Sequence, residues 1–199
     1  MNKRCVLLAL VIGATACGDG TTGPVPTDQP HFLQTAVGAP PLANPIVSFW
    51  ASYDHGGEAR IVYHALPSAG DSAVLLDFTV PSQSLLERPD GSRLGPGDSV
   101  LVTITVIDPI RMVAQFEPSG LRFSAARPAH LTLSLGEIDP DLNADGHVDA
   151  TDDLLKGELH IWRQEQLGDP WTQLPTQVDL VLGTVAADIS GFTNYAVAY

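Results

Sequence analysis

The sequence predicts an all-β protein, an antiparallel β-sandwich that follows a disordered N-terminal tether. Apolar and polar residues alternate in short runs, most clearly at residues 100–106 (VLVTITV) and 131–135 (LTLSL). The runs end at turn residues, and the chain has 18 Gly and 16 Pro for such turns. No segment has a long helical period. Many short alternating strands separated by turns are typical of two sheets that bury their inner faces against each other.

Residues 1–16 are expected to be a secretion signal peptide. Lys3 and Arg4 precede a short apolar stretch, residues 5–13 (CVLLALVIG), which is too short to cross a bilayer. Small residues follow, and then Cys17. This junction resembles a bacterial lipoprotein signal, which implies that Cys17 carries the lipid. An ordinary signal-peptidase site is the alternative.

Residues 17–42 are expected to hold the lipid-anchor cysteine and the flexible tether. Residues 18–30 (GDGTTGPVPTDQP) contain almost no apolar side chains that a core could bury. The expected location is outside the cytoplasm, as an outer-membrane or cell-surface lipoprotein that contacts the membrane through its anchor only. A periplasmic or freely secreted protein is the alternative. Cys5 would leave with the signal peptide, so no disulfide is expected in the mature chain.

Residues 43–199 are expected to form the β-sandwich domain. Strands are predicted at 46–53, 59–66, 72–80, 99–107, 121–126, 130–135, 158–162, 178–189 and 195–199. The large aromatic residues are expected in the core or at its rim, with a sugar-binding platform as the alternative for the tryptophans: Trp50, Trp162, Trp171, Phe192 and Tyr195.

The charge of the chain restricts its partners. The formal net charge is −13, from 23 acidic and 10 basic residues, and loss of Lys3 and Arg4 with the signal would take it to −15. Nucleic acid is therefore not an expected partner, because binding it requires a basic surface that displaces counterions. An acidic protein of this kind is compatible with cation binding.

Residues 141–152 (DLNADGHVDATD) have the residue types and spacing of a calcium loop. Calcium prefers hard oxygen ligands, and a short loop can surround the ion only if it turns sharply midway, which Gly146 allows. Val148 is expected to point into the core. The candidate ligands stand at positions 1, 3, 5, 7, 9 and 12 of the loop: Asp141, Asn143, Asp145, His147 through its carbonyl, Asp149 and Asp152.

This segment resembles the calcium loop of EF-hands and, more closely, that of dockerins. Pro140 excludes a helix directly before it, and at most a short helix over 151–156 is expected after it. A single loop does not imply the cohesin partner of paired dockerin loops. The expected Ca2+ is therefore structural, and it would stabilise the connection between the strands at 130–135 and 158–162. The alternative is a polar turn in an acidic protein.

Longer stretches resemble the β-sandwich domain shared by netrin receptors, zonula occludens proteins and ankyrins. The resemblance covers roughly residues 70–199 and rests on packing and turn residues. The segments are PGDSVLVTITVID (96–108), FEPSGLRFSAARPAHLTLSL (116–135), WTQLPTQVDLVLGTVAADI (171–189) and SGFTNYAVAY (190–199). It implies an interaction or structural module, not an enzyme, and names no partner. The partner expected at the cell envelope is an unidentified protein or glycan.

The sequence contains no catalytic motif as clear as the calcium loop. The Gly-Asp-Ser sequences ending at Ser72 and Ser99 echo some serine esterases, but neither Asp149 nor Asp153 has a histidine three residues on. The six histidines have no metal-ligand spacing. The expected function is thus an envelope-associated, non-catalytic binding or structural module, and a secreted hydrolase or carbohydrate-binding accessory domain is the alternative.

Overall fold

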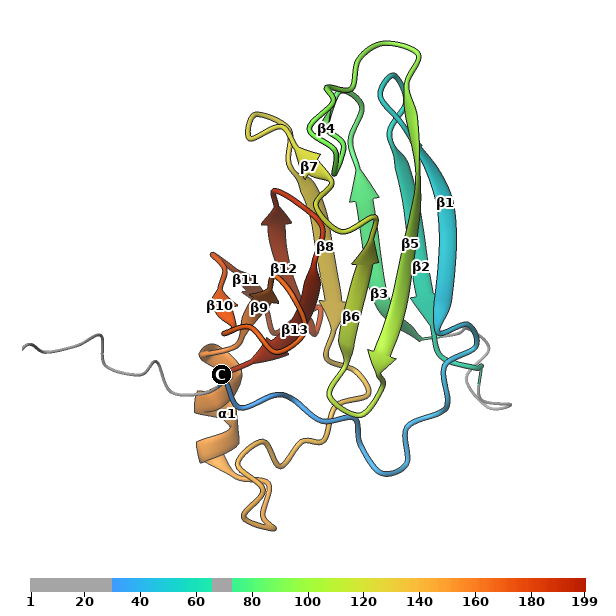
Figure 1. The fold of residues 1–199 in the computed structure, drawn as a ribbon. Helices are drawn as coiled ribbons and strands as arrows, with labels where there is room; N and C mark the ends of the chain where they lie inside the picture. The colour runs from blue at the N-terminus through green and yellow to red at the C-terminus, as the bar shows by residue number, and fades with distance from the viewer. Residues whose placement is uncertain (1–29, 66–72) are drawn as a thin grey trace, which may run out of the picture.

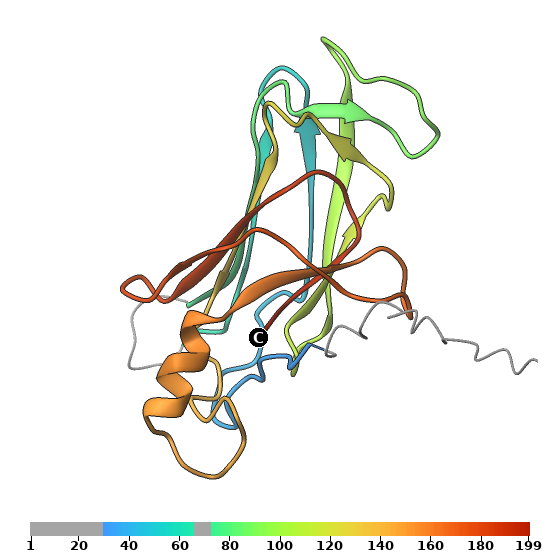
Figure 2. The ribbon, with the colours of Figure 1, turned by 90° about the vertical axis from the view of Figure 1, so that its left-hand side faces the viewer.

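The computed structural model describes residues 30–65 and 73–199, which form two antiparallel sheets packed face to face (Figures 1 and 2). This arrangement confirms the expected β-sandwich. The expected signal peptide, Cys17 and the tether before Pro30 lie outside the described residues, as does Ser72. Within the described part of the chain, no helix has the length and apolar character needed to span a membrane.

Each sheet draws its strands from both halves of the sequence. The six-stranded sheet has the order β1 (Ile46–Ser52), β5 (Ser99–Asp108), β6 (Val113–Glu117), β13 (Asn194–Ala198), β9 (His160–Gln164) and β10 (Thr172–Gln173). The five-stranded sheet has the order β11 (Gln177–Asp179), β12 (Thr184–Ile189), β8 (Ala129–Ser134), β3 (Val74–Val80) and β2 (Gly57–Val62). A small ribbon pairs β4 (Leu85–Glu87) with β7 (Arg122–Phe123), and the helix α1 (Ala150–Gly157) lies between β8 and β9 in the chain.

The core between the sheets is built around an aromatic cluster. The ring of Phe78 on β3 meets that of Phe116 on β6 with a centroid distance of 5.1 Å. Phe116 also packs edge-on against Tyr195 at 5.3 Å and lies 5.5 Å from Phe192. All four side chains are buried, which confirms the expectation for Phe192 and Tyr195. Tilted and edge-on pairs of this kind add to the stabilisation from apolar burial.

The turn between β1 and β2 carries the chain from one sheet to the other and requires glycine. Gly56 has a φ of +72°, and a Cβ there would lie 2.0 Å from the Val80 carbonyl oxygen. A Cβ on Gly57 would lie 2.6 Å from the ring of Phe49. The Gly56-Gly57 pair therefore allows the backbone and the Phe49 ring to approach at this corner.

The predicted strand over 178–189 is wrong in its first half. The chain forms a hairpin there, in which β11 pairs with β12 in an antiparallel register. The Asp179 carboxylate accepts bonds from the Val181 and Leu182 backbone N–H groups, each at 2.9 Å, and so closes the turn. The apolar residues of this turn have the composition of a strand, but they lie at the tip of the hairpin, where Val181 is 96% exposed. The strands β4, β6 and β10 were also not predicted.

The expected end of the tether at residue 42 is too late in the chain. Leu33 is 1% exposed, and its backbone N–H donates to the Val197 carbonyl at 3.0 Å. Thr35 and Leu42 form further bridges, to Ile138 and Tyr63. Residues 30–42 are therefore part of the folded domain, since this segment supplies both a core side chain and backbone pairing.

The three tryptophans have three different environments. Trp162 is buried, as expected, and its Nε1 donates to the Ala198 carbonyl at 3.2 Å. Trp171 is half-buried at the rim. Trp50 is 65% exposed, so the expectation that it is packed in the core is wrong. It points outward because Ala51 and Phe49, its neighbours on β1, take the inward positions.

Candidate functional site

The acidic segment 141–152 lies in the connection between β8 and β9, at the end of the sandwich where α1 lies (bottom of Figure 1). All six sequence-predicted ligands lie in this connection. The first four belong to the loop before the helix, and the last two, Asp149 and Asp152, stand at the start of α1.

The first half of the segment folds around its own backbone amides. The two carboxylate oxygens of Asp141 accept from the N–H groups of Asp145 (3.1 Å) and Gly146 (2.8 Å). The Asn143 side-chain oxygen also accepts from Asp145 N–H, at 3.0 Å. The Asp145 carboxylate accepts from His147 N–H at 2.9 Å. Gly146 has a φ of +88°, so it provides the expected turn.

The second half is a capped helix start. Asp149 is the N-cap of α1 and accepts from Thr151 N–H at 2.7 Å. Asp152 completes the capping box by accepting from Asp149 N–H at 2.8 Å. Its other carboxylate oxygen accepts from Leu142 N–H at 2.8 Å. The Asp152 carboxylate therefore ties the beginning of the loop to the beginning of the helix.

Asp152 is fully buried, yet it is held in its charged form. The hydrogen bond from Asp149 N–H, followed by those from Leu142 and Asn143, lowers the pKa of Asp152 below its ordinary value. Burial acts in the opposite direction. The hydrogen bonds prevail because backbone N–H donors stabilise the carboxylate but not the neutral acid.

The local charge is strongly negative. Lys156 pairs with Asp153 at 2.8 Å. Among the described residues, no basic side chain pairs with the other carboxylates of the segment, those of Asp141, Asp145, Asp149 and Asp152. The neighbouring Tyr199 hydroxyl donates to the Leu142 carbonyl at 2.7 Å. The pKa of Tyr199 is raised, first by burial and then by the charges of Asp152 and Asp141.

The donors fit calcium in chemical type, because they are carboxylate, amide and carbonyl oxygens. Their positions fit less closely. Within residues 30–65 and 73–199, no three acidic, histidine or cysteine side chains are gathered closely enough to hold a metal ion. Val148 is 61% exposed, so the expectation that it anchors the loop in the core is wrong. The segment is instead attached through Asp152 and through the Tyr199 bond to Leu142.

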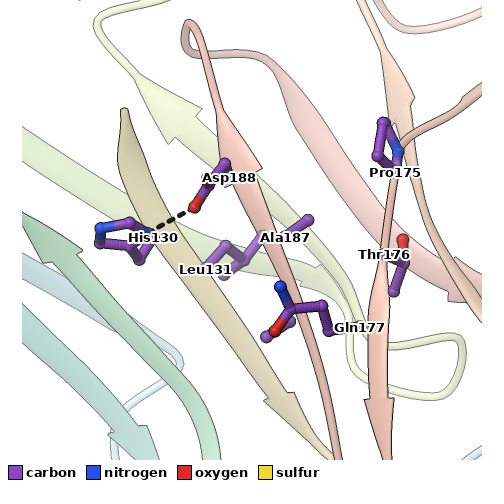
Figure 3. A pocket seen from close by; sticks show the side chains of 8 residues that line it. His130, Leu131, Pro175, Thr176, Gln177, Ala187 and Asp188 are labelled. Carbon is purple, nitrogen blue, oxygen red and sulfur yellow. Dashed lines mark hydrogen bonds and ion pairs between the residues drawn. The ribbon is translucent and has the colours of Figure 1, made fainter. Parts of the chain in front are cut away.

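A second polar site lies on the outer face of the five-stranded sheet (Figure 3). His130 on β8 and Asp188 on β12 are neighbours in the antiparallel register, and the His130 Nδ1 lies 2.5 Å from a carboxylate oxygen of Asp188. A cavity of about 660 Å³ extends from them past Gln177 and Thr176. Both members of the pair are more than half exposed. Only the strand register brings these residues together, so no local sequence signal could have found the pair.

Within residues 30–65 and 73–199, no nucleophile is hydrogen-bonded to this histidine–aspartate pair. In the part of the chain that the structure describes, His130 forms no hydrogen bond with a serine, threonine or cysteine. The nearby Thr176 hydroxyl donates to the Leu174 carbonyl and accepts from Ile161 N–H, each at 2.9 Å. Ser99 lies at the exposed start of β5, directly after the turn that Asp98 closes by accepting from Gly95 N–H.

No protein-family model, curated protein or solved structure matches the chain. The two antiparallel sheets establish the chain as a mostly-β protein, and these comparisons identify no family for it.

Proposed function

We propose that this chain is an envelope-associated, non-catalytic binding or structural module, and that one calcium ion stabilises its 141–152 segment. The observation that carries the proposal is the group of four carboxylates, Asp141, Asp145, Asp149 and Asp152, without a basic partner among the described residues. Like charges held within one short segment repel one another. A bound cation would remove this repulsion.

Asp141, Asn143, Asp145 and the His147 carbonyl would hold the ion, and Asp149 and Asp152 would complete the site. The hydrogen bonds already made by Asp141 and Asp145 leave lone pairs free, because each carboxylate oxygen can accept more than once. Bound calcium would stabilise the loop, and so fix the long connection between β8 and β9.

The binding role is supported by the resemblance to the sandwich of netrin receptors, zonula occludens proteins and ankyrins. Two packing residues and a turn residue lie in the stretch that carries this resemblance. Leu121 and Phe123 are buried, and Gly120, with a φ of +87°, forms the turn before them. The partner in this proposal is an envelope protein or glycan.

The envelope location rests on the sequence of residues 1–17. Cleavage before Cys17 and attachment of a diacylglyceryl group would anchor the protein. Mass spectrometry of the mature N-terminus tests this directly. An unmodified N-terminus elsewhere in the chain, together with unchanged membrane release of Cys17→Ala, would exclude the anchor.

Thermal melting with calcium and with chelator tests the calcium proposal. Calcium at about 100 times its dissociation constant adds roughly 2.7 kcal/mol to the free energy of unfolding. We expect the melting temperature to rise by several degrees in calcium for the wild type, and not for Asp145→Asn. Asp188→Asn is the matched control, because Asp188 is an exposed carboxylate on a different surface, and it should keep the response. A wild-type midpoint that is equal in calcium and chelator would refute the proposal.

A further inference from the structure

A second cavity, of about 450 Å³, lies beside the six-stranded sheet and is lined from four separate parts of the chain. Its volume is within the range of small-molecule sites, roughly 300–1,000 Å³. Its apolar lining includes Phe32, Leu167 and Trp171, and its polar lining includes Asp108, Arg111 and Gln164. The combination of an aromatic wall with a few polar groups is typical of ligand sites.

The aromatic wall is formed by Trp171 and Phe32. Their rings meet edge-on, with a centroid distance of 5.0 Å and an interplanar angle of 67°. Leu167 extends the wall and is 82% exposed. An aromatic side chain held by a neighbouring ring at the rim of a cavity offers a flat apolar surface at little cost in side-chain entropy.

The loop that carries Leu167 and Trp171 is fixed by hydrogen bonds from the side chains of Gln164 and Thr193. Gln164, at the end of β9, is 6% exposed, and its Nε2 donates to the Asp169 carbonyl at 2.8 Å. The Thr193 hydroxyl donates to the Glu165 carbonyl at 2.9 Å. These partly buried hydrogen bonds hold the aromatic wall in position before any ligand arrives.

Arg111 supplies a free positive charge at the other side of the cavity. Four arginines of the described chain pair with carboxylates: Arg60, Arg88, Arg122 and Arg163. Arg111 does not, although the chain has a formal charge of −13. Asp108 forms no ion pair with Arg111 among the described residues. One of its carboxylate oxygens instead closes the turn by accepting from the Ile110 and Arg111 backbone N–H groups, each at 3.0 Å.

We propose that this cavity binds an acidic saccharide, a sugar ring that bears a carboxylate. The apolar face of the ring would pack on Trp171, and the carboxylate would pair with Arg111, whose planar guanidinium suits it. The second carboxylate oxygen of Asp108 would accept a sugar hydroxyl. This assignment rests on the binding role proposed above and names its ligand.

A saccharide suits the cavity better than an extended peptide. Peptides that add to a sheet need a strand edge with unpaired backbone groups. Here the sheet strands beside the cavity are enclosed: β6 lies between β5 and β13, and β9 lies between β13 and β10. Recognition must therefore come from side chains, and those present match a ring with hydroxyl groups and one negative charge.

The test is a calorimetric titration with two probes, digalacturonate and the neutral disaccharide galactobiose. We expect the wild type to bind digalacturonate at least tenfold more tightly than galactobiose. A charge-assisted hydrogen bond to Arg111 would increase the affinity by about that factor. Arg111→Gln should remove the preference. Trp171→Phe should weaken both probes while retaining an aromatic ring for packing against Phe32. The matched controls are Arg93→Gln and Trp50→Phe, which change an exposed arginine and an exposed tryptophan elsewhere and should leave binding unaltered.

Several results would overturn the assignment. They are no binding of either probe, equal affinity for both, binding that survives Arg111→Gln and Trp171→Phe, and displacement of digalacturonate by an acidic peptide of equal or higher affinity. None of these results alters the response of the melting temperature to calcium. Failure of the saccharide site can therefore be told apart from failure of the calcium proposal.

Discussion

Asp152 shows how one side chain can organise a polar segment. Its carboxylate is fully buried and accepts from the N–H groups of Leu142 and Asp149, which are far apart in the loop. It thereby caps α1 and closes the loop at the same time. This role differs from that of a simple surface ligand, because the residue stabilises the connection before any ion is bound.

Replacing Asp152 should therefore destabilise the protein measurably. Asp152→Ala leaves the Leu142 and Asp149 N–H groups without their acceptor and removes the capping box, so we expect the melting temperature to fall by about 5 °C or more. Circular dichroism melts in chelator measure this effect without calcium. Asp153→Asn is the control, since Asp153 is exposed and pairs only with Lys156, and its midpoint should be nearly unchanged. Equal midpoints for the two variants would contradict the role of Asp152.

The same residue predicts a dependence on pH. The pKa of Asp152 is lowered in the folded protein, mainly by Asp149 N–H, so the unfolded chain takes up the proton first as the pH falls. The stabilisation is complete above the unfolded pKa, about 3.9, and is lost as the pH falls through the folded pKa. Urea midpoints measured from pH 6 to pH 2.5 should show the gap between wild type and Asp152→Asn closing below about pH 4. A gap of constant size would mean that Asp152 acts through packing alone.

Some residue environments could not be predicted from the sequence. Alternation shows that neighbouring side chains face opposite sides of a strand, but it does not show which side is buried when both contain apolar residues. Phe49, Trp50 and Ala51 are such a case. Val148 is another, because the inward position expected for it depends on a loop geometry that the Asp152 bonds replace.

At the scale of elements, the segment before β1 is a structural part of the sandwich. It carries few strand signals because it forms single bridges in place of a long ladder, at Phe32, Thr35 and Leu42. Its sequence is rich in Pro, which is why it resembles a linker. The alternating strands were predicted well, whereas β4 and β10 have only three and two residues and leave no period to detect.

Leu33→Ala tests the contribution of this segment. Leu33 is 1% exposed in the core, and truncation of a buried leucine lowers the free energy of unfolding by about 2–5 kcal/mol. Val37→Ala is the control from the same segment, because Val37 is fully exposed, and it should change stability by less than about 0.5 kcal/mol. Chemical unfolding of the two variants measures both. A tether without a structural role would make the two variants indistinguishable.

At the scale of the whole molecule, the fold class follows from local pattern, whereas the candidate sites do not. Alternation and turn residues are enough to predict a sandwich, because alternation indicates that each strand has one apolar face to bury and turn residues indicate where each strand ends. The cavity beside Trp171 and Arg111 depends on strand order, and the His130–Asp188 pair depends on register. Both properties come from contacts between distant segments. The acidic segment is the exception, since its donors are close together in sequence.

Calcium binding by this acidic segment is the central claim, and a calorimetric titration of calcium into the folded protein tests it most directly. The account predicts uptake of one ion per chain, with a dissociation constant of roughly 10⁻⁴–10⁻³ M or tighter, as in other extracellular calcium modules. Asp145→Asn should abolish the uptake. If the wild type takes up no calcium at millimolar concentration, the carboxylates of residues 141–152 only cap a helix and close a turn, and the proposed function loses its basis.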